Sequence, residues 1–307
     1  MKQQTGKWMI LGGVILAMLL SSLDQTIVST AMPTIVQELH GLEHISWVFT
    51  AYMLGSTVTV PIYGKLSDIF GRRNLYLLGI VIFLGGSVLC GLSQDMTQLI
   101  FFRGLQGIGG GAMMVNSFAI IGDVFPPAER GKYQGMIGGV FGLSSVAGPL
   151  LGGWITDNTS WRWVFYVNIP LGIIAIIVLS AALPKIPVHA RNRKIDWLGG
   201  LFITTALVPL LLSLVWGGSV YQWSSWQIIA SLALSFVSLF IFIQNEKRVQ
   251  NPILSLGLFT NKVFLVSVCA LFFTAMGMFN CALIDAMIVR YSLSMSSAAR
   301  VGSVGRL

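Results

Sequence analysis

Residues 64–74, GKLSDIFGRRN, are the stretch that says most about how this chain folds. This short polar stretch separates two long apolar runs, 46–63 and 75–93. Apolar residues make up 55% of the chain and charged residues only 10%, whereas a soluble domain carries about 25% charged residues. A membrane-spanning helix needs roughly 20 mainly apolar residues, so the flanking runs predict two such helices joined by a tight loop.

The same pattern repeats along the chain and predicts an all-α membrane protein. Apolar runs of spanning length alternate with short segments that contain Gly, Pro, Asn or charge. We expect nine spans, at about 8–30, 46–63, 75–93, 98–121, 133–156, 163–183, 197–216, 226–243 and 263–284.

The formal net charge is +8, and the distribution of the basic residues predicts the orientation. A nucleic-acid-binding protein would gather this charge on a surface. Here the charge lies in alternate short loops, nearly all on one side of the membrane, which indicates the cytoplasmic face. The N-terminus is therefore expected in the cytoplasm, with these basic residues inside: Lys2, Lys7, Lys65, Arg72, Arg73, Arg130, Lys132, Lys185, Arg191, Arg193, Lys194, Lys247, Arg248 and Lys262. The outside loops through the eighth helix hold Arg162 with Glu38, Glu43, Asp95 and Asp157.

We expect four segments along the chain. Residues 1–184 form a six-helix half, 185–250 a basic loop with two inserted helices, 251–284 a connector and the first helix of an incomplete second half, and 285–307 an atypical tail. The tail is basic where the alternation predicts an outside position, which suggests a frameshifted or truncated product.

Two charged residues lie inside predicted spans. Asp24 follows Trp8 by about 16 residues, or roughly 24 Å of helix, in an apolar run that continues to Pro33. It is either an aspartate that snorkels at a helix end or a buried, functional carboxylate, and the continuing run favours the second. Burial disfavours the charged form of a carboxylate, which suits a reversible proton carrier. Arg103 either extends its side chain to the outer membrane interface or faces the interior of the helix bundle. We favour the interior, because the polar residue Gln106 lies about one helical turn away on a related face.

The loop 64–74 has its own chemistry. Gly64 and Gly71 permit a tight reversal, and Asp68 and Arg72 are spaced to pair across one helical turn. An ordinary cytoplasmic turn requires only basic residues. An acidic residue between two glycines, followed by the double arginine Arg72-Arg73, is a more specific pattern than that.

The fifth span is rich in glycine. Gly138 and Gly142 form one row with a spacing of four, and Gly148 and Gly152 belong to a second, which predicts close helix packing. Pro149 removes a backbone donor and is expected to bend the helix, so this segment is either a packing seam or a pivot.

The sequence gives little support to an enzyme. The glycines at 107–111 lack the Gly-Lys-Ser/Thr ending of a nucleotide loop. We find no metal cluster, no nucleophile–base pair and no motif for a cofactor, and the three cysteines lie in or beside apolar runs as packing residues.

Together these motifs resemble the major facilitator superfamily, in its fourteen-helix drug:proton antiporter branch. The resemblance rests on 64–74, on 99–112, on Gly148-Pro149 with Gly152-Gly153, on 23–28 with 31–33, and on 161–165 with 168–170. It implies two six-helix halves with an inserted helix pair and alternating access to a midplane site. It further implies that Asp24, Arg103 and Gln106 serve proton or substrate coupling, that Gly64, Asp68, Gly71, Arg72 and Arg73 form an inside latch, and that Gly148, Pro149 and Gly152 form a pivot.

The sequence thus predicts a carrier in the inner (plasma) membrane that exports lipophilic, often cationic, compounds in exchange for protons. Two alternatives stay open. The chain is a non-transporting truncated fragment, which is either inert or associates with another transporter half. Alternatively, it is a facilitator-superfamily carrier of a different solute, since a fold does not fix its substrate.

Overall fold

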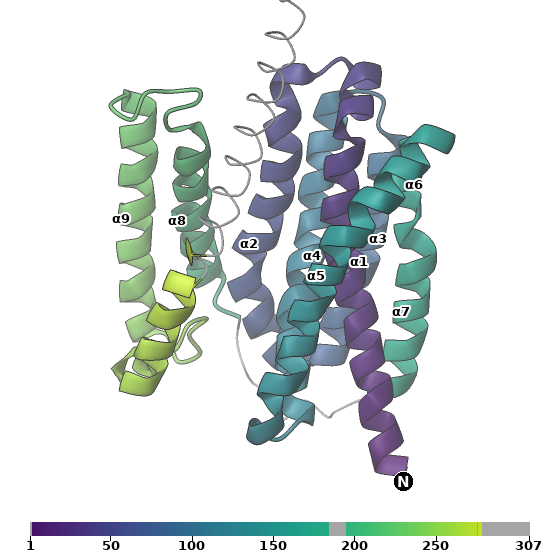
Figure 1. Cartoon of the computed structure of the whole chain (residues 1–307). Helices are drawn as coiled ribbons and strands as arrows, with labels where there is room; N and C mark the ends of the chain where they lie inside the picture. The colour runs from purple at the N-terminus through teal and green to yellow at the C-terminus, as the bar shows by residue number, and fades with distance from the viewer. Residues whose placement is uncertain (1, 184–194, 275, 278–307) are drawn as a thin grey trace, which may run out of the picture. The chain divides into compact units, whose positions relative to one another are not determined.

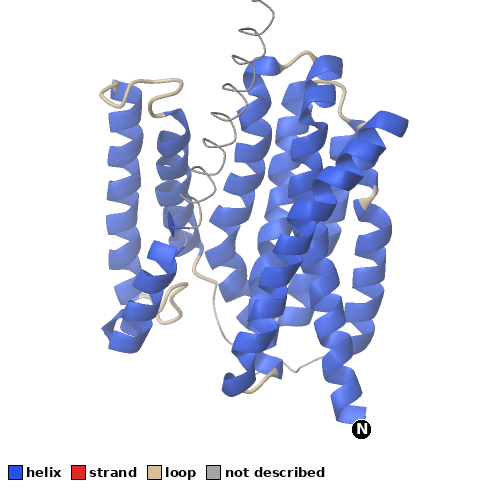
Figure 2. Cartoon of the chain, in the orientation of Figure 1, coloured by secondary structure: helices blue, strands red, loops and turns tan. Residues whose placement is uncertain are grey.

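The computed structural model describes residues 2–183, 195–274 and 276–277, which are predominantly helical (Figure 1, Figure 2). In this part of the chain, eight helices are long and apolar enough to cross a membrane. The chain is thus a multi-pass membrane protein of the all-α class. It divides into two compact units, Met1–Leu254 and Ser255–Leu307, which are described separately.

The first unit contains the helices that carry the charged residues of interest. In chain order they are α1 (Lys2–Leu39), the 3₁₀ turn η1 (Leu42–His44), α2 (Ile45–Phe70), α3 (Arg72–Leu92), α4 (Met96–Val124), α5 (Pro127–Asn158), α6 (Trp163–Tyr166), α7 (Asn168–Ala182), α8 (Trp197–Trp216) and α9 (Trp226–Arg248). The second unit contains η2 (Leu256–Thr260) and an apolar helix, Lys262–Thr274.

Local sequence explains where several helices begin. The Asp95 side chain accepts a hydrogen bond from the Gln98 amide at 2.8 Å, and Asp196 does the same for Gly199 at 2.8 Å. Aspartate is a preferred N-cap because it satisfies a backbone donor that the helix leaves free. Pro127 begins α5, where a missing N–H costs nothing.

Helix α4 packs between α2 and α3, and its glycines make this possible. A Cβ atom on Gly109 would lie 2.6 Å from the carbonyl oxygen of Gly79 on α3, and one on Gly107 would collide with the Tyr52 backbone on α2. The glycine-rich segment at 107–111 is therefore a packing surface on two sides. Helix α1 contacts α5 and α7 and also reaches α4.

The apolar core of this bundle has two main parts. One contains α1 residues from Ile10 to Leu20 with Tyr133 and Leu183, and the other contains α1 residues from Leu23 onward with Trp161. Asp24 lies where the two clusters meet along α1, with apolar packing on both sides.

Several helices are longer than predicted. Helix α1 continues past Pro33 to Leu39, because transmembrane helices tolerate proline where neighbouring groups compensate for the lost hydrogen bond. Helix α2 continues to Phe70, so Gly64 lies inside it and the expected two-glycine turn is wrong. Gly71 alone makes the reversal, with a φ of 88° that strongly favours glycine.

The sixth predicted span is divided. Helix α6 ends at Tyr166 and α7 begins at Asn168, with Val167 between them. The ninth predicted span is described only as Lys262–Thr274 and residues 276–277. The basic loop at 184–194 and the proposed tail at 285–307 lie outside the described residues, and the four predicted segments stay a prediction.

Helices α8 and α9, predicted as an inserted pair, form a hairpin with polar contacts between them. The hydroxyl oxygens of Ser213 and Ser231 lie 2.6 Å apart, and Ser235 donates to the Ala206 carbonyl at 2.7 Å. Small polar residues commonly tie transmembrane helices together in this way.

Candidate functional site

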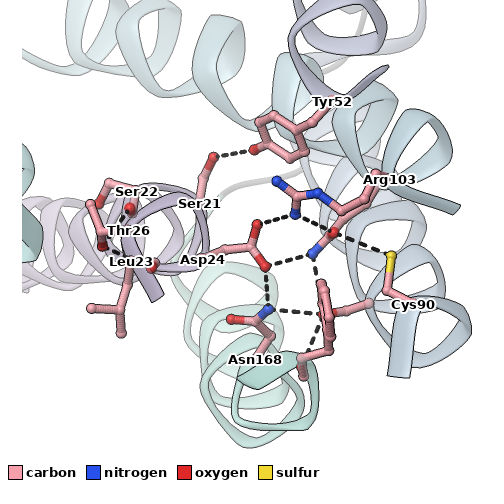
Figure 3. Close-up of polar contacts among 12 residues, drawn as sticks. Ser21, Ser22, Leu23, Asp24, Thr26, Tyr52, Cys90, Arg103 and Asn168 are labelled. Atoms are coloured by element: carbon pink, nitrogen blue, oxygen red, sulfur yellow. Dashed lines mark hydrogen bonds and ion pairs between the residues drawn. The ribbon is translucent and has the colours of Figure 1, made fainter. Parts of the chain in front are cut away.

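Asp24 and Arg103, the two charged residues predicted inside spans, meet in the centre of the bundle (Figure 3). The Arg103 Nη1 atom lies 2.6 Å from Asp24 Oδ2, and both residues are 0% exposed. Asp24 is fifteen residues from the end of α1 at Leu39, so it is not a helix-end aspartate. Arg103 faces the interior, as its neighbours in the sequence suggested.

Two side-chain amides complete the contacts of the Asp24 carboxylate. Gln106 Nε2 and Asn168 Nδ2 each donate to Oδ1 at 2.8 Å. All three partners of the carboxylate are therefore N–H donors, on α4 and α7. This arrangement suits an ionised carboxylate, which can only accept hydrogen bonds.

Arg103 is held from two further directions. Its guanidinium carbon lies 4.4 Å from the centre of the Tyr52 ring on α2, and Nη1 also donates to Gln106 Oε1 at 2.8 Å. A buried arginine over an aromatic face gains attraction that water does not weaken. The Tyr52 hydroxyl lies 3.0 Å from the Ser21 hydroxyl, which connects α2 back to α1.

A second layer of polar groups lies on α3. Ser87 Oγ accepts from Asn168 Nδ2 at 2.8 Å and from Gln106 Nε2 at 3.2 Å, and it donates to the Phe165 carbonyl at 2.9 Å. The Cys90 thiol lies 3.7 Å from Gln106 Oε1. The site thus joins five helices, because Asp24 lies on α1, Tyr52 on α2, Ser87 and Cys90 on α3, Arg103 and Gln106 on α4, and Asn168 on α7.

Sequence reasoning found three of these residues and missed four. Asp24, Arg103 and Gln106 were predicted, whereas Tyr52, Ser87, Cys90 and Asn168 were not assigned to a site. Asn168 offered a signal, because an amide inside an apolar run is costly in a membrane unless it has partners. Ser87 and Cys90 offered none, since small polar residues are common in helix packing.

The predicted latch residues lie together where α2 meets α3. Arg72 pairs with Asp68 at 3.4 Å, as their spacing suggested, and it also pairs with Asp123 near the end of α4. Arg73 instead donates to the Ser180 carbonyl near the end of α7 at 2.7 Å. The two neighbouring arginines therefore connect α3 to different helices.

Of the predicted pivot residues, Gly148 and Gly152 lie in the contact between α5 and α1, whereas Pro149 is exposed. A Cβ atom on Gly148 would collide with Thr26, and one on Gly152 would lie 3.0 Å from the Ile27 carbonyl oxygen. Ser144 belongs to the same row and its hydroxyl lies 2.6 Å from that of Ser22.

The other glycine row of α5 meets no neighbouring helix in the described part of the chain. Positions for a Cβ atom on Gly138 and Gly142 meet no atom of the described residues within 4 Å. Within the described residues, close packing is therefore seen for the second row and not for this one, because the spacing of four fixes which residues share a face but not which face meets a neighbour.

The opposite end of the bundle has its own charged cluster. Glu38 at the end of α1 pairs with Arg162 and accepts from Trp161 Nε1 at 2.8 Å. Arg162, the basic residue predicted outside, therefore forms an ion pair with Glu38, an acidic residue predicted on the same side.

A model of one protein family, the Major Facilitator Superfamily, matches residues 14–305. The chain belongs to the major facilitator superfamily. The match contains the whole site around Asp24 and continues into the segment 285–307 that is predicted as an atypical tail. This is a superfamily of transport proteins, not of enzymes.

Two relatives come from Bacillus subtilis (strain 168). The chain is 46% identical over 280 residues to the multidrug transporter protein MdtP, covering 91% of this chain and 51% of the relative. It is 45% identical over 263 residues to multidrug resistance protein 3, covering 86% and 51%. The chain therefore spans about half the length of these curated relatives.

A solved structure supports the fold. The human organic anion transporter MFSD10 (TETRAN) matches with a TM-score of 0.55 at 20% identity, over 73% of this chain and 59% of that one. At this level of identity the likeness shows the fold alone.

Proposed function

We propose that the chain carries the proton-coupling site of an exporter of lipophilic, often cationic, small molecules. The observation that carries this proposal is the ion pair between Asp24 and Arg103, which is buried from water between two apolar clusters. Charged side chains at such a depth are costly, and in membrane proteins they mark ion and substrate pathways. The names of the two bacterial relatives support a multidrug substrate range.

In the proposed cycle, Asp24 alternates between a proton and a cationic substrate. Arg103, Gln106 and Asn168 hold the ionised carboxylate at one defined position, and Tyr52 keeps the guanidinium in place. A proton on Asp24 removes the charge that Arg103 balances, so the ion pair weakens. Competition between a proton and a cation for one carboxylate couples their opposite movements.

Alternating access requires parts that hold and parts that move. We assign Asp68, Arg72 and Arg73 to a latch at the cytoplasmic end, together with Gly64 and the turn at Gly71. The contact of Gly148 and Gly152 with α1, beside Pro149, is the proposed pivot, because close backbone packing lets two helices rotate against each other without side chains in the way. The chain is placed in the plasma membrane with its N-terminus in the cytoplasm, as the distribution of basic residues indicates.

A second candidate is that the chain acts only in association with another transporter half. The side of α5 that carries Gly138 and Gly142 meets no described residue, and Leu143, Val146 and Leu150 are exposed. A substrate site between two halves would then need a partner on this side.

Transport by the chain in liposomes tests both candidates. With an imposed proton gradient, we expect uptake of ethidium, a lipophilic cation, but not of a neutral sugar, and loss of this uptake in Asp24→Asn. Asp157→Asn is the matched control, since Asp157 is an exposed carboxylate at the far end of α5. Sugar transport would indicate a different solute, and unchanged ethidium transport by Asp24→Asn would remove Asp24 from the mechanism. Transport that appears only with a second half would favour the second candidate.

A further inference from the structure

Asn168 is the first residue of α7, directly after the interruption at Val167, and its side chain is fully buried. Its amide nitrogen uses both hydrogens, one toward Asp24 Oδ1 and one toward Ser87 Oγ, each at 2.8 Å. Its amide oxygen, Oδ1, finds no hydrogen-bond partner in the described part of the chain. Figure 3 shows the nitrogen turned toward Asp24 and the oxygen turned away from it.

A buried carbonyl oxygen without a partner is costly, so this orientation of the amide needs a reason. The reason is the charge on Asp24. An ionised carboxylate accepts hydrogen bonds only, and the nitrogen of Asn168 supplies one. The amide can therefore donate to the charged carboxylate only in an orientation that leaves its own oxygen without a hydrogen bond.

Protonation of Asp24 reverses this preference. A protonated carboxyl group carries an O–H donor. The Asn168 nitrogen is also a donor, so it cannot accept a hydrogen bond from this O–H. A half-turn of the Asn168 amide exchanges its nitrogen and oxygen, so that Oδ1 accepts from the new O–H. The exchange needs no backbone movement, because the two ends of an amide have nearly the same shape.

The half-turn also affects Ser87. Ser87 Oγ now donates to the Phe165 carbonyl at 2.9 Å while it accepts from Asn168. With Oδ1 of Asn168 in the former position of the nitrogen, the Ser87 hydroxyl gains a second acceptor and turns toward it. The Phe165 carbonyl, next to the end of α6 at Tyr166, then loses its side-chain donor.

The other groups around Asp24 do not offer the same response. Gln106 also donates from its amide nitrogen to Asp24, but its oxygen accepts from Arg103, so a half-turn would point its nitrogen at another donor. The titratable and charged groups that face it are Arg103 on α4, Tyr52 on α2 and Cys90 on α3. Arginine only donates, and Tyr52 and Cys90 have partners in Ser21 and Gln106. The nearby polar side chain of α5, Ser144, does not titrate and is bound to Ser22 and Thr26.

We propose that Asn168 is a positioning residue that reports the protonation state of Asp24 to the break between α6 and α7. The inference rests on the proposed function, in which Asp24 gains and loses a proton. It adds the route by which this proton changes the structure, from Asp24 through the Asn168 amide and the Ser87 hydroxyl to the Phe165 carbonyl.

Hydrogen exchange of the backbone amides at 163–172 tests the proposal in the purified chain. Protection factors, which remove the intrinsic effect of pH on exchange, are measured at a series of pH values. In the wild-type chain we expect protection to fall about fivefold as pH falls, which is the effect of losing one hydrogen bond. Asp24→Asn offers a donor and an acceptor like a protonated acid, so its protection should be low at every pH.

Two variants interrupt the route at different points. Asn168→Leu removes the amide, and Ser87→Ala removes the hydroxyl, so both should lose the pH response. Asn116→Leu is the matched control, because Asn116 is also a buried asparagine with an unpartnered oxygen but lies on α4, bound to the Ala112 carbonyl. It should keep the wild-type response.

The outcomes separate this inference from the proposed function. A pH response that survives Asn168→Leu and Ser87→Ala but disappears in Asp24→Asn would overturn the role of Asn168 alone. A response that survives Asp24→Asn would count against Asp24 as the proton site and hence against the proposed function. The absence of any response in the wild-type chain would also overturn the role of Asn168.

Discussion

At the scale of single residues, the balance between Asp24 and Arg103 governs the centre of the bundle. Two opposite charges buried together gain little stability, because the cost of removing both from water offsets their attraction. Leaving either charge without the other is far more costly. The pair is therefore better explained by a function that needs a buried charge than by stability.

This balance predicts a non-additive pair of substitutions. Asp24→Asn and Arg103→Gln should each lower the free energy of unfolding by about 3–5 kcal/mol, because each leaves a buried charge unpaired. The double variant removes both charges, so its free energy of unfolding should fall clearly less than the sum of the losses in the two single variants. Reversible denaturation of the chain in detergent measures all three, and additive losses would show that the two charges do not interact.

Tyr52 allows a finer test of how Arg103 is held. Tyr52→Phe keeps the ring beneath the guanidinium and loses only the contact with Ser21, at about 0.5–1.5 kcal/mol. Tyr52→Leu also removes the attraction between ring and cation, which adds about 2 kcal/mol in a desolvated site. The same denaturation experiment distinguishes the two variants, and equal losses would mean that the ring contributes nothing.

At the scale of helices, the two glycine rows of α5 have different surroundings. Gly148 and Gly152 lie against α1, where Thr26 and the Ile27 carbonyl leave no space for a methyl group. Gly138 meets nothing within 4 Å in the described residues. Helix α5 thus has one face in close contact with α1 and another face without a described neighbour. Only the face in contact with α1 limits the size of the residue at a glycine position.

Substitution by alanine should separate the two rows. Gly148→Ala should destabilise the chain by about 1–3 kcal/mol, because the added methyl forces α1 and α5 apart. Gly138→Ala should be neutral or stabilising by up to about 1 kcal/mol, since alanine favours the helix. The shift in unfolding midpoint measures both, and equal effects would contradict the assigned contact.

At the scale of the whole molecule, the charge distribution predicts an orientation in the membrane. The ends of the helices alternate between a basic side, with Arg72 and Arg130, and a side where Arg162 is matched by Glu38. Basic loops remain in the cytoplasm during insertion. The turn at Gly71 is therefore expected inside, and the turn at η1 outside.

Labelling of single cysteines in intact cells tests this orientation. In a chain whose native cysteines are replaced by serine, Glu43→Cys in η1 should react with a membrane-impermeant maleimide. Glu129→Cys, exposed in the first turn of α5, should react only after the cells are opened. The reverse pattern would place the N-terminus outside.

The sequence by itself determined the helices, the membrane and the family, because apolar length, loop charge and short motifs are local properties. It also identified Asp24, Arg103 and Gln106, since polar groups inside an apolar run are conspicuous. It could not identify Asn168 or Ser87 as their partners, nor which glycine row of α5 packs. Asp24 and Arg103 are 79 residues apart and Asp24 and Asn168 are 144 apart. Only the packing of the helices decides which of their faces meet, and therefore which donors surround the buried carboxylate.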